Sequence, residues 1–334
     1  MIKNNILKTP ILIIGLGSIG KRHLRNLYNI GHRNINVLRI SNKNLLELNY
    51  KKMIKSIFFN DQDAFNVGPK YIIICLPTSM HRKYIIKGIN INAQIFCEIP
   101  LFHNYLRNDL KFLKKFNFKN KIFITGFNFR FHPIIIKIKK IIEENKIGTP
   151  MFSKLHFGEK IDNIHTWEDF KSRYEVRKEL GGGVTRTSAH EIDMVYFLFG
   201  KIRTLYCEQK NLKIKDINCE DFVHINFTHS NGVNSTIILD FISDTYTRKM
   251  EIFFTKGIIE WNFKNSCFNI YKNNKWKRNK YKFDFNLTYI NALKCFLGLN
   301  KNKDYSDLND GMYIQKIISK LDYSSKKGKK INLR

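Results

Sequence analysis

A glycine-rich turn close to the N-terminus constrains the fold of this chain more than any other feature of its sequence. The turn runs from Gly15 to Gly20 as Gly-Leu-Gly-Ser-Ile-Gly, directly after the apolar run Ile11-Leu12-Ile13-Ile14. Residues 19–30 then carry apolar side chains at helical spacing, and Gly31 ends the pattern. A strand, a turn and a helix in this order place backbone N–H groups at a helix N-terminus, where they bind phosphate.

Each glycine of the turn has its own expected role. Gly15 permits the tight turn, Gly17 lets the backbone approach a pyrophosphate, and Gly20 lets the helix pack closely on the strand. We therefore expect a dinucleotide to bind here, with Ser18 and Ile19 as further contacts. The alternative is a glycine-rich turn that holds no ligand.

The first part of the chain alternates short β-rich runs with helical patterns, which indicates parallel βαβ units. Strands are expected at residues 11–15, 35–40, 71–75, 94–97 and 122–126, and a second helix after Pro77. This pattern predicts an N-terminal Rossmann domain with a parallel sheet, which we assign to residues 1–125.

Beyond about residue 150, longer strands are joined by tight turns. Strands at 222–227 and 235–241 flank an Asn-Gly pair at 231–232, and strands at 249–254 and 258–263 flank Lys256-Gly257. An amphipathic helix over 313–321 closes the chain. We therefore expect residues 126–334 to form an α/β domain with an open, mostly antiparallel sheet.

The end of the second expected strand bears on the choice between NAD and NADP. A carboxylate about 20 residues beyond the last glycine would bind the ribose 2′-hydroxyl of NAD. This chain has Arg39 and Ser41 there, and its next carboxylate is Glu47. A guanidinium and a hydroxyl suit a 2′-phosphate, so NADP is preferred and NAD stays the alternative. Arg39 could instead be one surface cation among many.

Composition narrows the class of partner. The 334 residues are enough for two domains, and the net charge of +30 comes from lysines spread along the whole chain, so we expect no nucleic-acid partner. No apolar run reaches the length of a membrane span, and no signal peptide precedes the first strand, so we expect a cytoplasmic protein without a membrane partner. Six cysteines without a CxxC pair predict no metal site.

Four further segments resemble motifs of the Gfo/Idh/MocA oxidoreductase family. The loop Cys75–His81 resembles its Pro-Thr-x-x-His motif, Phe96–Leu101 resembles Cys-Glu-Lys-Pro-Leu, and Gly126–Pro133 resembles Gly-[Tyr/Phe]-x-x-Arg-Phe-x-Pro. Gly181-Gly182-Gly183-Val184, followed by His190, resembles the family's active-site helix. With Asp310-Gly311 near the end, the resemblance extends over essentially the whole chain.

The resemblance implies hydride transfer between NAD or NADP and a sugar, a nucleotide sugar or a cyclitol. It implies a homodimer or homotetramer through the C-terminal sheet. The implied cofactor contacts from the strand-end loops are Leu76, Pro77, Thr78, His81 and Glu98. Residues 165–181 are similar to a subgroup that serves bacterial surface-glycan synthesis, including that of nonulosonic acids.

Two positions depart from the family pattern. The lysine of the Glu-Lys-Pro motif is Ile99, which cannot carry a proton, and the aspartate three residues before the histidine is Thr187. His190 is then the best candidate acid or base, and Asp193 lies one helical turn away, where it could orient the ring. The alternative for His190 is a structural histidine.

Candidate substrate contacts are Arg130, Trp167, Arg177 and Thr187. Guanidinium groups make bidentate contacts with carboxylate or phosphate, and an indole stacks on a sugar face. Structural or surface roles stay open for each. The leading hypothesis is an NAD(P)-dependent sugar oxidoreductase. The alternatives are a cofactor-binding but catalytically impaired homologue, such as a sensor or a partner subunit, and a lyase or glycosidase that borrows transient oxidation.

Overall fold

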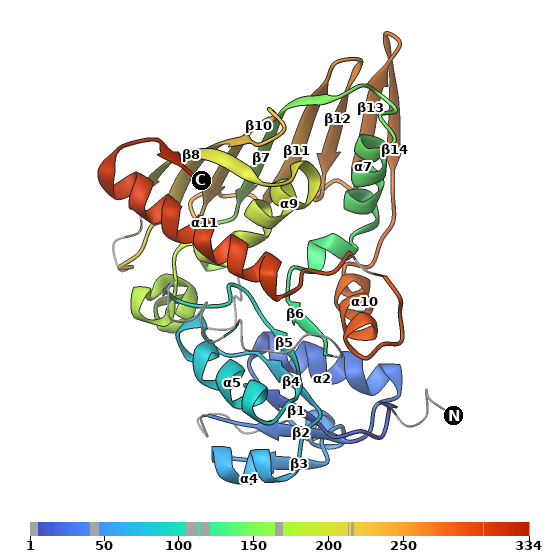
Figure 1. Cartoon of the computed structure of the whole chain (residues 1–334), viewed down its shortest axis with the longest axis vertical. Helices are drawn as coiled ribbons and strands as arrows, with labels where there is room; N and C mark the ends of the chain where they lie inside the picture. Colours follow the sequence, from blue (N-terminus) through green and yellow to red (C-terminus); the bar gives the residue numbers. More distant parts are fainter. Residues whose placement is uncertain are drawn as a thin grey trace. The chain divides into compact units, whose positions relative to one another are not determined.

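The computed structural model describes residues 6–40, 47–104, 113, 121–163, 170–212, 214, 217–302 and 304–333. The chain forms two compact units, the first from Met1–Phe131 with Phe285–Met312 and the second from His132–Asp284 with Tyr313–Arg334 (Figure 1). These units differ from the expected ranges 1–125 and 126–334, because a segment near the C-terminus packs with the N-terminal unit.

The first unit contains a six-stranded parallel sheet in the order β3-β2-β1-β4-β5-β6. Its strands are β1 (Ile11–Ile14), β2 (Ile35–Leu38), β3 (Ser56–Phe58), β4 (Tyr71–Ile74), β5 (Gln94–Cys97) and β6 (Phe123–Thr125). The strand order reverses between β1 and β4, which is where Rossmann folds bind dinucleotides. The Rossmann prediction is therefore confirmed. The three-residue β3 was missed because so short a run shows no clear period.

Helices cover both faces of this sheet. They are α2 (Ser18–Ile30), α3 (Leu48–Lys51), α4 (Asp61–Asn66), α5 (Thr78–Asn90), the 3₁₀ turn η2 (Asn128–Phe131) and α10 (Asn286–Phe296). Leu24 and Leu27 of α2 share one core cluster with Leu293 and Phe296 of α10, and all four are fully buried. This shared core explains why residues 285–312 belong to the first unit.

The second unit contains a nine-stranded sheet in the order β14-β13-β12-β11-β7-β10-β9-β8-β15. Its strands are β7 (Pro150–Gly158), β8 (Ile202–Lys210), β9 (Phe222–His229), β10 (Asn234–Asp240), β11 (Thr247–Phe254), β12 (Gly257–Asn262), β13 (Cys267–Lys272), β14 (Lys275–Lys280) and β15 (Ile331–Asn332). Neighbouring strands run antiparallel except β7 and β10, which are parallel. The mostly antiparallel sheet was predicted correctly.

Alternation along the strands decides which side chains meet the helices. In β9 every second residue is buried, so Ile225 and Phe227 point to the core and Asn226 to the other face. The expected Asn-Gly hairpin forms, with Gly232 at φ 90° and the His229 amide donating to the Val233 carbonyl over 2.8 Å.

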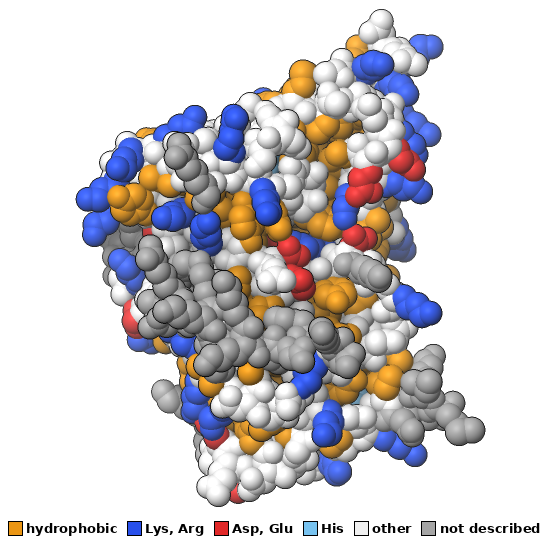
Figure 2. Space-filling model, in the orientation of Figure 1, with side chains coloured by type: hydrophobic (Ala, Val, Ile, Leu, Met, Phe, Trp, Pro, Cys, Tyr) orange, Lys and Arg blue, Asp and Glu red, His pale blue; other side chains and the backbone are white. Residues whose placement is uncertain are grey.

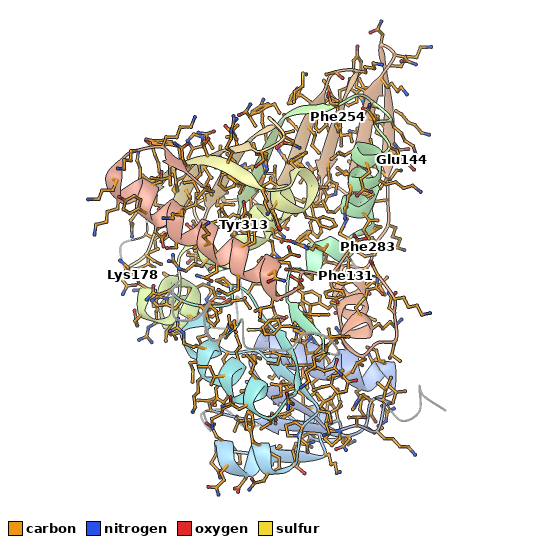
Figure 3. All side chains as sticks on the ribbon, in the orientation of Figure 1. Phe131, Glu144, Lys178, Phe254, Phe283 and Tyr313 are labelled. Carbon is orange, nitrogen blue, oxygen red and sulfur yellow. The ribbon has the colours of Figure 1, made fainter. Side chains whose placement is uncertain are left out.

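Helices lie on one face of the nine-stranded sheet (Figure 1). They are α7 (Pro133–Glu143), α8 (Val184–Thr187), α9 (Ala189–Phe199) and the part of α11 (Leu308–Lys327) that follows Met312. Tyr313 anchors α11 to β8, because the Ile202 amide donates to its hydroxyl over 2.7 Å (Figure 3). Within the described ranges, no helix is long and apolar enough to span a membrane.

Lysine and arginine side chains are spread over the face of the molecule seen in Figure 2 and do not gather into one patch there. This distribution matches the spread of lysines along the sequence.

The packing of α10 yields a test by a matched pair of leucines. Leu293→Ala removes a fully buried side chain and should cost about 2–5 kcal/mol. Leu287→Ala, on the same helix but 40% exposed, should change the stability by no more than about 0.5 kcal/mol. Thermal unfolding of both variants provides the measurement. Equal shifts in Tm would contradict the assignment of α10 to the core of the first unit.

Candidate functional site

The glycine-rich turn joins β1 to α2 with very little room. Gly15 adopts φ +92°, and a Cβ atom there would lie 2.6 Å from the Cys75 carbonyl oxygen. A Cβ on Gly20 would lie 2.2 Å from the Gly15 carbonyl oxygen. Both distances are far below any real Cβ contact, so these two glycines are required by the fold itself.

Gly17 differs from its two neighbours. A Cβ atom there would meet nothing within 4 Å, and its φ of −74° suits any residue. Gly17 is the N-cap of α2, no side chain caps the first turn, and that turn contains no acidic residue. The exposed residues Gly17 and Ser18 therefore present uncapped amides at the positive end of a 13-residue helix. This arrangement fits a dinucleotide pyrophosphate.

Arg39 directly follows β2, where its amide donates to the Phe58 carbonyl over 2.9 Å, and its side chain is half-buried. Ser41 lies outside the described residues. Glu47 pairs with Lys21 of α2 over 3.2 Å. Of the two residues predicted to bind a 2′-phosphate, Arg39 and Ser41, the structure therefore describes only Arg39.

The loop after β4 holds Leu76 and Pro77 at its half-buried surface and Thr78 buried at the start of α5. The His81 ring is fully buried between the carbonyl oxygens of Leu76, at 2.7 Å, and Pro100, at 3.1 Å. Burial lowers the pKa of His81, and the hydrogen bonds to these carbonyl oxygens oppose that shift. His81 ties together the two loops that follow β4 and β5.

Glu98 follows β5, and its carboxylate oxygen Oε1 lies 2.6 Å from Nε2 of His23 on α2. Sequence reasoning missed His23, although it stands three residues after Gly20 on the buried face of the helix. A lone histidine in a helix carries no signal of its partner. The pair with Glu98 could only be found in the folded chain.

Arg130 lies in η2 and is almost fully buried. Its Nη1 forms an ion pair with Oδ2 of Asp310, at 2.7 Å, within the first unit. Arg177, in the second unit, is exposed and pairs with Glu179 at 2.7 Å, while Trp167 lies outside the described residues. Arg130 and Arg177 thus belong to different units, and each pairs with a carboxylate of its own unit.

Three consecutive glycines lead into α8 and α9, and each is required for a separate reason. Gly181 adopts φ +92° at the end of a 3₁₀ turn. A Cβ on Gly182 would lie 2.5 Å from the Tyr174 carbonyl oxygen. Gly183 adopts φ +109°, and a Cβ there would lie 2.4 Å from the Glu220 carboxylate, which accepts a hydrogen bond from the Thr185 amide. The Gly-Gly-Gly motif therefore fixes the path of the chain toward His190.

His190 is the second residue of α9, and its Nδ1 is buried although the residue as a whole is half-buried. Burial and the positive charge of Arg248 lower its pKa to about 3, so the imidazole is neutral at pH 7. Asp193 is buried one helical turn further along α9, as expected from the spacing. The Thr187 hydroxyl is buried at the end of α8 without a hydrogen-bond partner among the described residues.

Arg248 of β11 is held from two sides. Its Nε donates to Glu191 Oε1 over 2.7 Å, and its Nη1 donates to the Tyr246 hydroxyl over 3.2 Å. Burial raises the pKa of Glu191, and the Arg248 charge opposes that rise. Sequence reasoning missed Arg248, which lies nearly 60 residues from the motif it affects. In the part of the chain that the structure describes, no cluster of His, Cys, Asp and Glu could hold a metal ion.

Comparisons with known proteins agree with this geometry. Residues 9–122 match the family described as "Oxidoreductase family, NAD-binding Rossmann fold", and residues 135–260 match "GFO/IDH/MocA C-terminal domain". The chain is 27% identical to the uncharacterized oxidoreductase YrbE of Bacillus subtilis, over 73% of this chain and 71% of that protein. It is 24% identical to myo-inositol 2-dehydrogenase of Thermotoga maritima, over 57% of this chain and 54% of that protein.

One solved structure with the same fold contains two bound ligands. It is the WlbA dehydrogenase of Bordetella pertussis in complex with NADH and UDP-GlcNAcA. The two chains superpose with a TM-score of 0.79 at 16% identity, over 98% of this chain and 99% of WlbA. At this level of identity the similarity shows the fold.

The different surroundings of Gly17 and Gly20 allow the binding role to be separated from the folding role. Gly17→Ala should leave Tm unchanged, because its Cβ meets no atom, and should weaken NADH binding at least about tenfold by blocking the approach of the pyrophosphate. Gly20→Ala should lower Tm, because its Cβ meets backbone. Differential scanning fluorimetry and an NADH fluorescence titration measure the two effects. Wild-type affinity in Gly17→Ala would remove the turn from the binding site.

Proposed function

Since the chain belongs to the Gfo/Idh/MocA oxidoreductase family, we propose that it oxidises or reduces a sugar or nucleotide-sugar derivative by hydride transfer. The observation that carries the proposal is the glycine-rich turn with its uncapped helix N-terminus, which fits a dinucleotide pyrophosphate. The matches to an inositol dehydrogenase and to a structure that contains a UDP-sugar support the substrate class.

A bound nicotinamide supplies or accepts the hydride, and the chain supplies orientation and proton handling. In this proposal, the amides of Gly17, Ser18 and Ile19 bind the pyrophosphate, and Glu98 accepts a hydrogen bond from the cofactor. His190 handles the proton. With a pKa of about 3 the ring is neutral at pH 7, and it needs stabilisation by bound substrate to take the proton of a substrate hydroxyl in the oxidation direction. Ile99 cannot take part, and Thr187 can only form hydrogen bonds.

The finer parts of the proposal concern the cofactor and the pathway. NADP is preferred over NAD on the strength of Arg39, whose side chain follows the strand that normally ends in a carboxylate. A role in bacterial surface-glycan synthesis is supported by the fold shared with WlbA, whose structure contains UDP-GlcNAcA. Arg177, Trp167 and Arg130 stay proposed substrate contacts, and a cytoplasmic location stays a prediction.

One specific observation favours a second candidate function. The chain lacks both the lysine and the aspartate of the family motifs, which are Ile99 and Thr187 here. A cofactor-bound protein that turns over slowly, and that serves as a sensor or as a partner subunit, would have this pattern. Both candidate functions predict cofactor binding, but only the leading one predicts substantial turnover.

Turnover with a panel of sugars, nucleotide sugars and inositols, each with NAD and NADP, tests the leading function. His190→Gln should lower kcat about 100-fold or more while the affinity for NADH stays unchanged, because it removes a proton acceptor and not a cofactor contact. Ile99→Lys should change kcat little if the native chemistry never uses that position. A large rise in kcat for Ile99→Lys would favour the impaired homologue. No turnover in any combination, despite NADH binding, would contradict the leading function.

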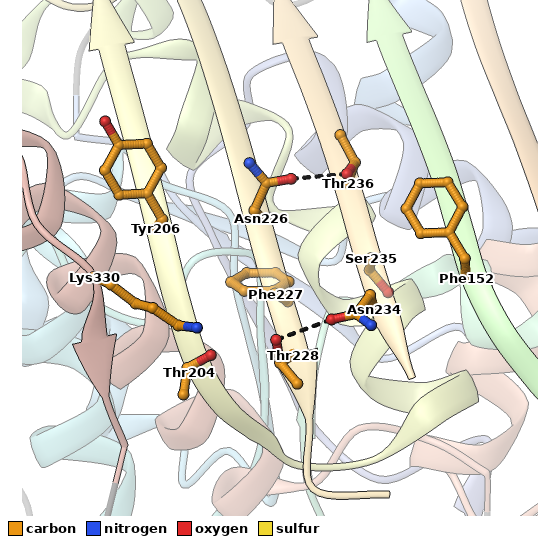
Figure 4. A pocket seen from close by; sticks show the side chains of 10 residues that line it. All are labelled: Phe152, Thr204, Tyr206, Asn226, Phe227, Thr228, Asn234, Ser235, Thr236 and Lys330. Atoms are coloured by element: carbon orange, nitrogen blue, oxygen red, sulfur yellow. Dashed lines mark hydrogen bonds between the residues drawn. The ribbon is translucent and has the colours of Figure 1, made fainter. Parts of the chain in front are cut away.

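We also propose that the protein forms a homodimer or homotetramer through the face of the nine-stranded sheet opposite its helices. This face carries half-buried apolar side chains such as Phe152, Phe253 and Ile238, and the rings of Phe152 and Phe253 stack at 6.0 Å. Next to them, Asn226 and Thr236 hydrogen-bond across strands in a shallow hollow of about 230 Å³ (Figure 4). A mixed apolar and amide-rich surface of this kind suits contact with a second protein.

A charge introduced on this face of the sheet tests whether the protein assembles through it. Wild-type protein should have the mass of a dimer or tetramer in light scattering, and Ile238→Glu should shift it to a monomer by burying an unpaired carboxylate. Leu287→Glu, at an exposed position on α10 outside the sheet, is the control and should leave the mass unchanged. A monomeric wild-type protein at micromolar concentration would contradict the proposal.

A further inference from the structure

A buried imidazole–carboxylate pair connects α2 to the end of β5. His23 Nε2 lies 2.6 Å from Glu98 Oε1. The His23 side chain is fully buried, whereas the Glu98 side chain is 14% exposed. The histidine therefore contacts the carboxylate from the interior and leaves its other side accessible.

The surroundings of the His23 ring determine which atom donates. Its Nδ1 is buried and has no hydrogen-bond partner among the described residues. Nε2 is therefore the ring nitrogen that meets a partner, and its N–H donates to the Glu98 carboxylate oxygen. Edge contacts with Phe96, at 5.1 Å, and Tyr289, at 6.1 Å, hold the plane of the ring.

The second carboxylate oxygen of Glu98 lies against Gly126. A Cβ atom on Gly126 would lie 2.8 Å from Oε2, so only glycine leaves space for the carboxylate in this position. The Glu98 amide donates to the Ile74 carbonyl over 3.0 Å, and the Gly126 amide donates to Cys97 over 2.8 Å. With Oε1 held by His23, Oε2 is the oxygen that can still accept a hydrogen bond.

Glu98 and the glycine-rich turn lie at the same edge of the sheet, because β1 and β5 are parallel and both features directly follow their strands. His23 belongs to α2, the helix whose N-terminus faces the proposed pyrophosphate. One helix thus places both the phosphate-binding amides and the partner of Glu98.

We infer that His23 is a positioning residue that orients the Glu98 carboxylate so that Oε2 accepts a hydrogen bond from the bound dinucleotide. The inference rests on the cofactor role of Glu98 in the proposed function. It gives His23 a role in cofactor affinity although the ring is too deeply buried to touch the cofactor.

Two substitutions of similar size and polarity separate orientation from simple packing. His23→Gln places its amide nitrogen close to the position of Nε2, whereas His23→Asn places it close to that of Nδ1. We expect His23→Asn to weaken NADH binding about tenfold in a fluorescence titration, and His23→Gln to stay within about threefold of wild type. His32→Asn, at an equally buried histidine of the same unit, is the control and should bind NADH as wild type does.

A double-mutant cycle with Glu98→Gln completes the test. If His23 acts through Glu98, the combination of His23→Asn and Glu98→Gln should bind NADH no more weakly than Glu98→Gln alone. Additive losses, or equal losses in the Gln and Asn variants of His23, would overturn the inference, since packing alone would then explain them. The Gln variant and Glu98→Gln still decide the outcome if the Asn variant does not fold.

The cofactor role of Glu98 and the positioning role of His23 can be contradicted separately. Weakened binding in Glu98→Gln with unchanged binding in His23→Asn overturns the inference and leaves the proposed function in place. Unchanged binding in Glu98→Gln removes Glu98 from the cofactor site and overturns the inference as well. The Gly17→Ala measurement then still reports on the dinucleotide site independently.

Discussion

The close approach of α2 to the end of β1 is the constraint on which the first unit depends. The helix can start where it does only because positions 15 and 20 have no Cβ atom, since either one would lie less than 2.7 Å from a backbone oxygen. From that starting point, the first-turn amides are directed past the carboxyl end of the sheet, and Leu24 and Leu27 reach the core. The same placement brings His23 within 2.6 Å of Glu98. Replacing Gly15 or Gly20 by a residue with a Cβ atom would displace the first-turn amides, the two leucines and His23 together.

Two arginines with little exposed side chain, Arg130 and Arg248, are held by carboxylates from distant parts of the chain. Arg130 pairs with Asp310 in the first unit, and Arg248 pairs with Glu191 in the second. Taking a guanidinium out of water is costly, and the partner carboxylate offsets that cost while it fixes the direction of the fork. Each pair joins a segment to an element far away in the sequence. The charge of Arg248 still acts on its surroundings, because it lowers the pKa of both His190 and His132.

Features with a local cause were predictable from the sequence. The strands β1, β4 and β5, the helix α2 with its left-handed Gly31 cap, and the Asn-Gly hairpin all follow from period, glycine position and turn chemistry. The features that the sequence did not predict depend on contacts between residues far apart in the chain. The packing of α10 against the first sheet, the pairing of His23 with Glu98 and the effect of Arg248 on His190 have no local signature. For the same reason the sequence offers Arg130 as a candidate substrate contact and gives no sign of its ion pair with Asp310.

The electrostatics around His190 bear on how a chain without the family's lysine and aspartate can still move a proton. The best acid–base groups have a pKa close to the working pH. An imidazole with a pKa near 3 therefore accepts a proton readily only when its protonated form is stabilised. Burial is the first cause of the low value, and the charge of Arg248 is the second. A polar substrate that hydrogen-bonds to the ring would offset the first cause, and the Glu191 carboxylate already screens the second. In the proposed function, His190 would then become a competent base only with substrate present, and proton transfer would depend on substrate binding in the absence of a lysine.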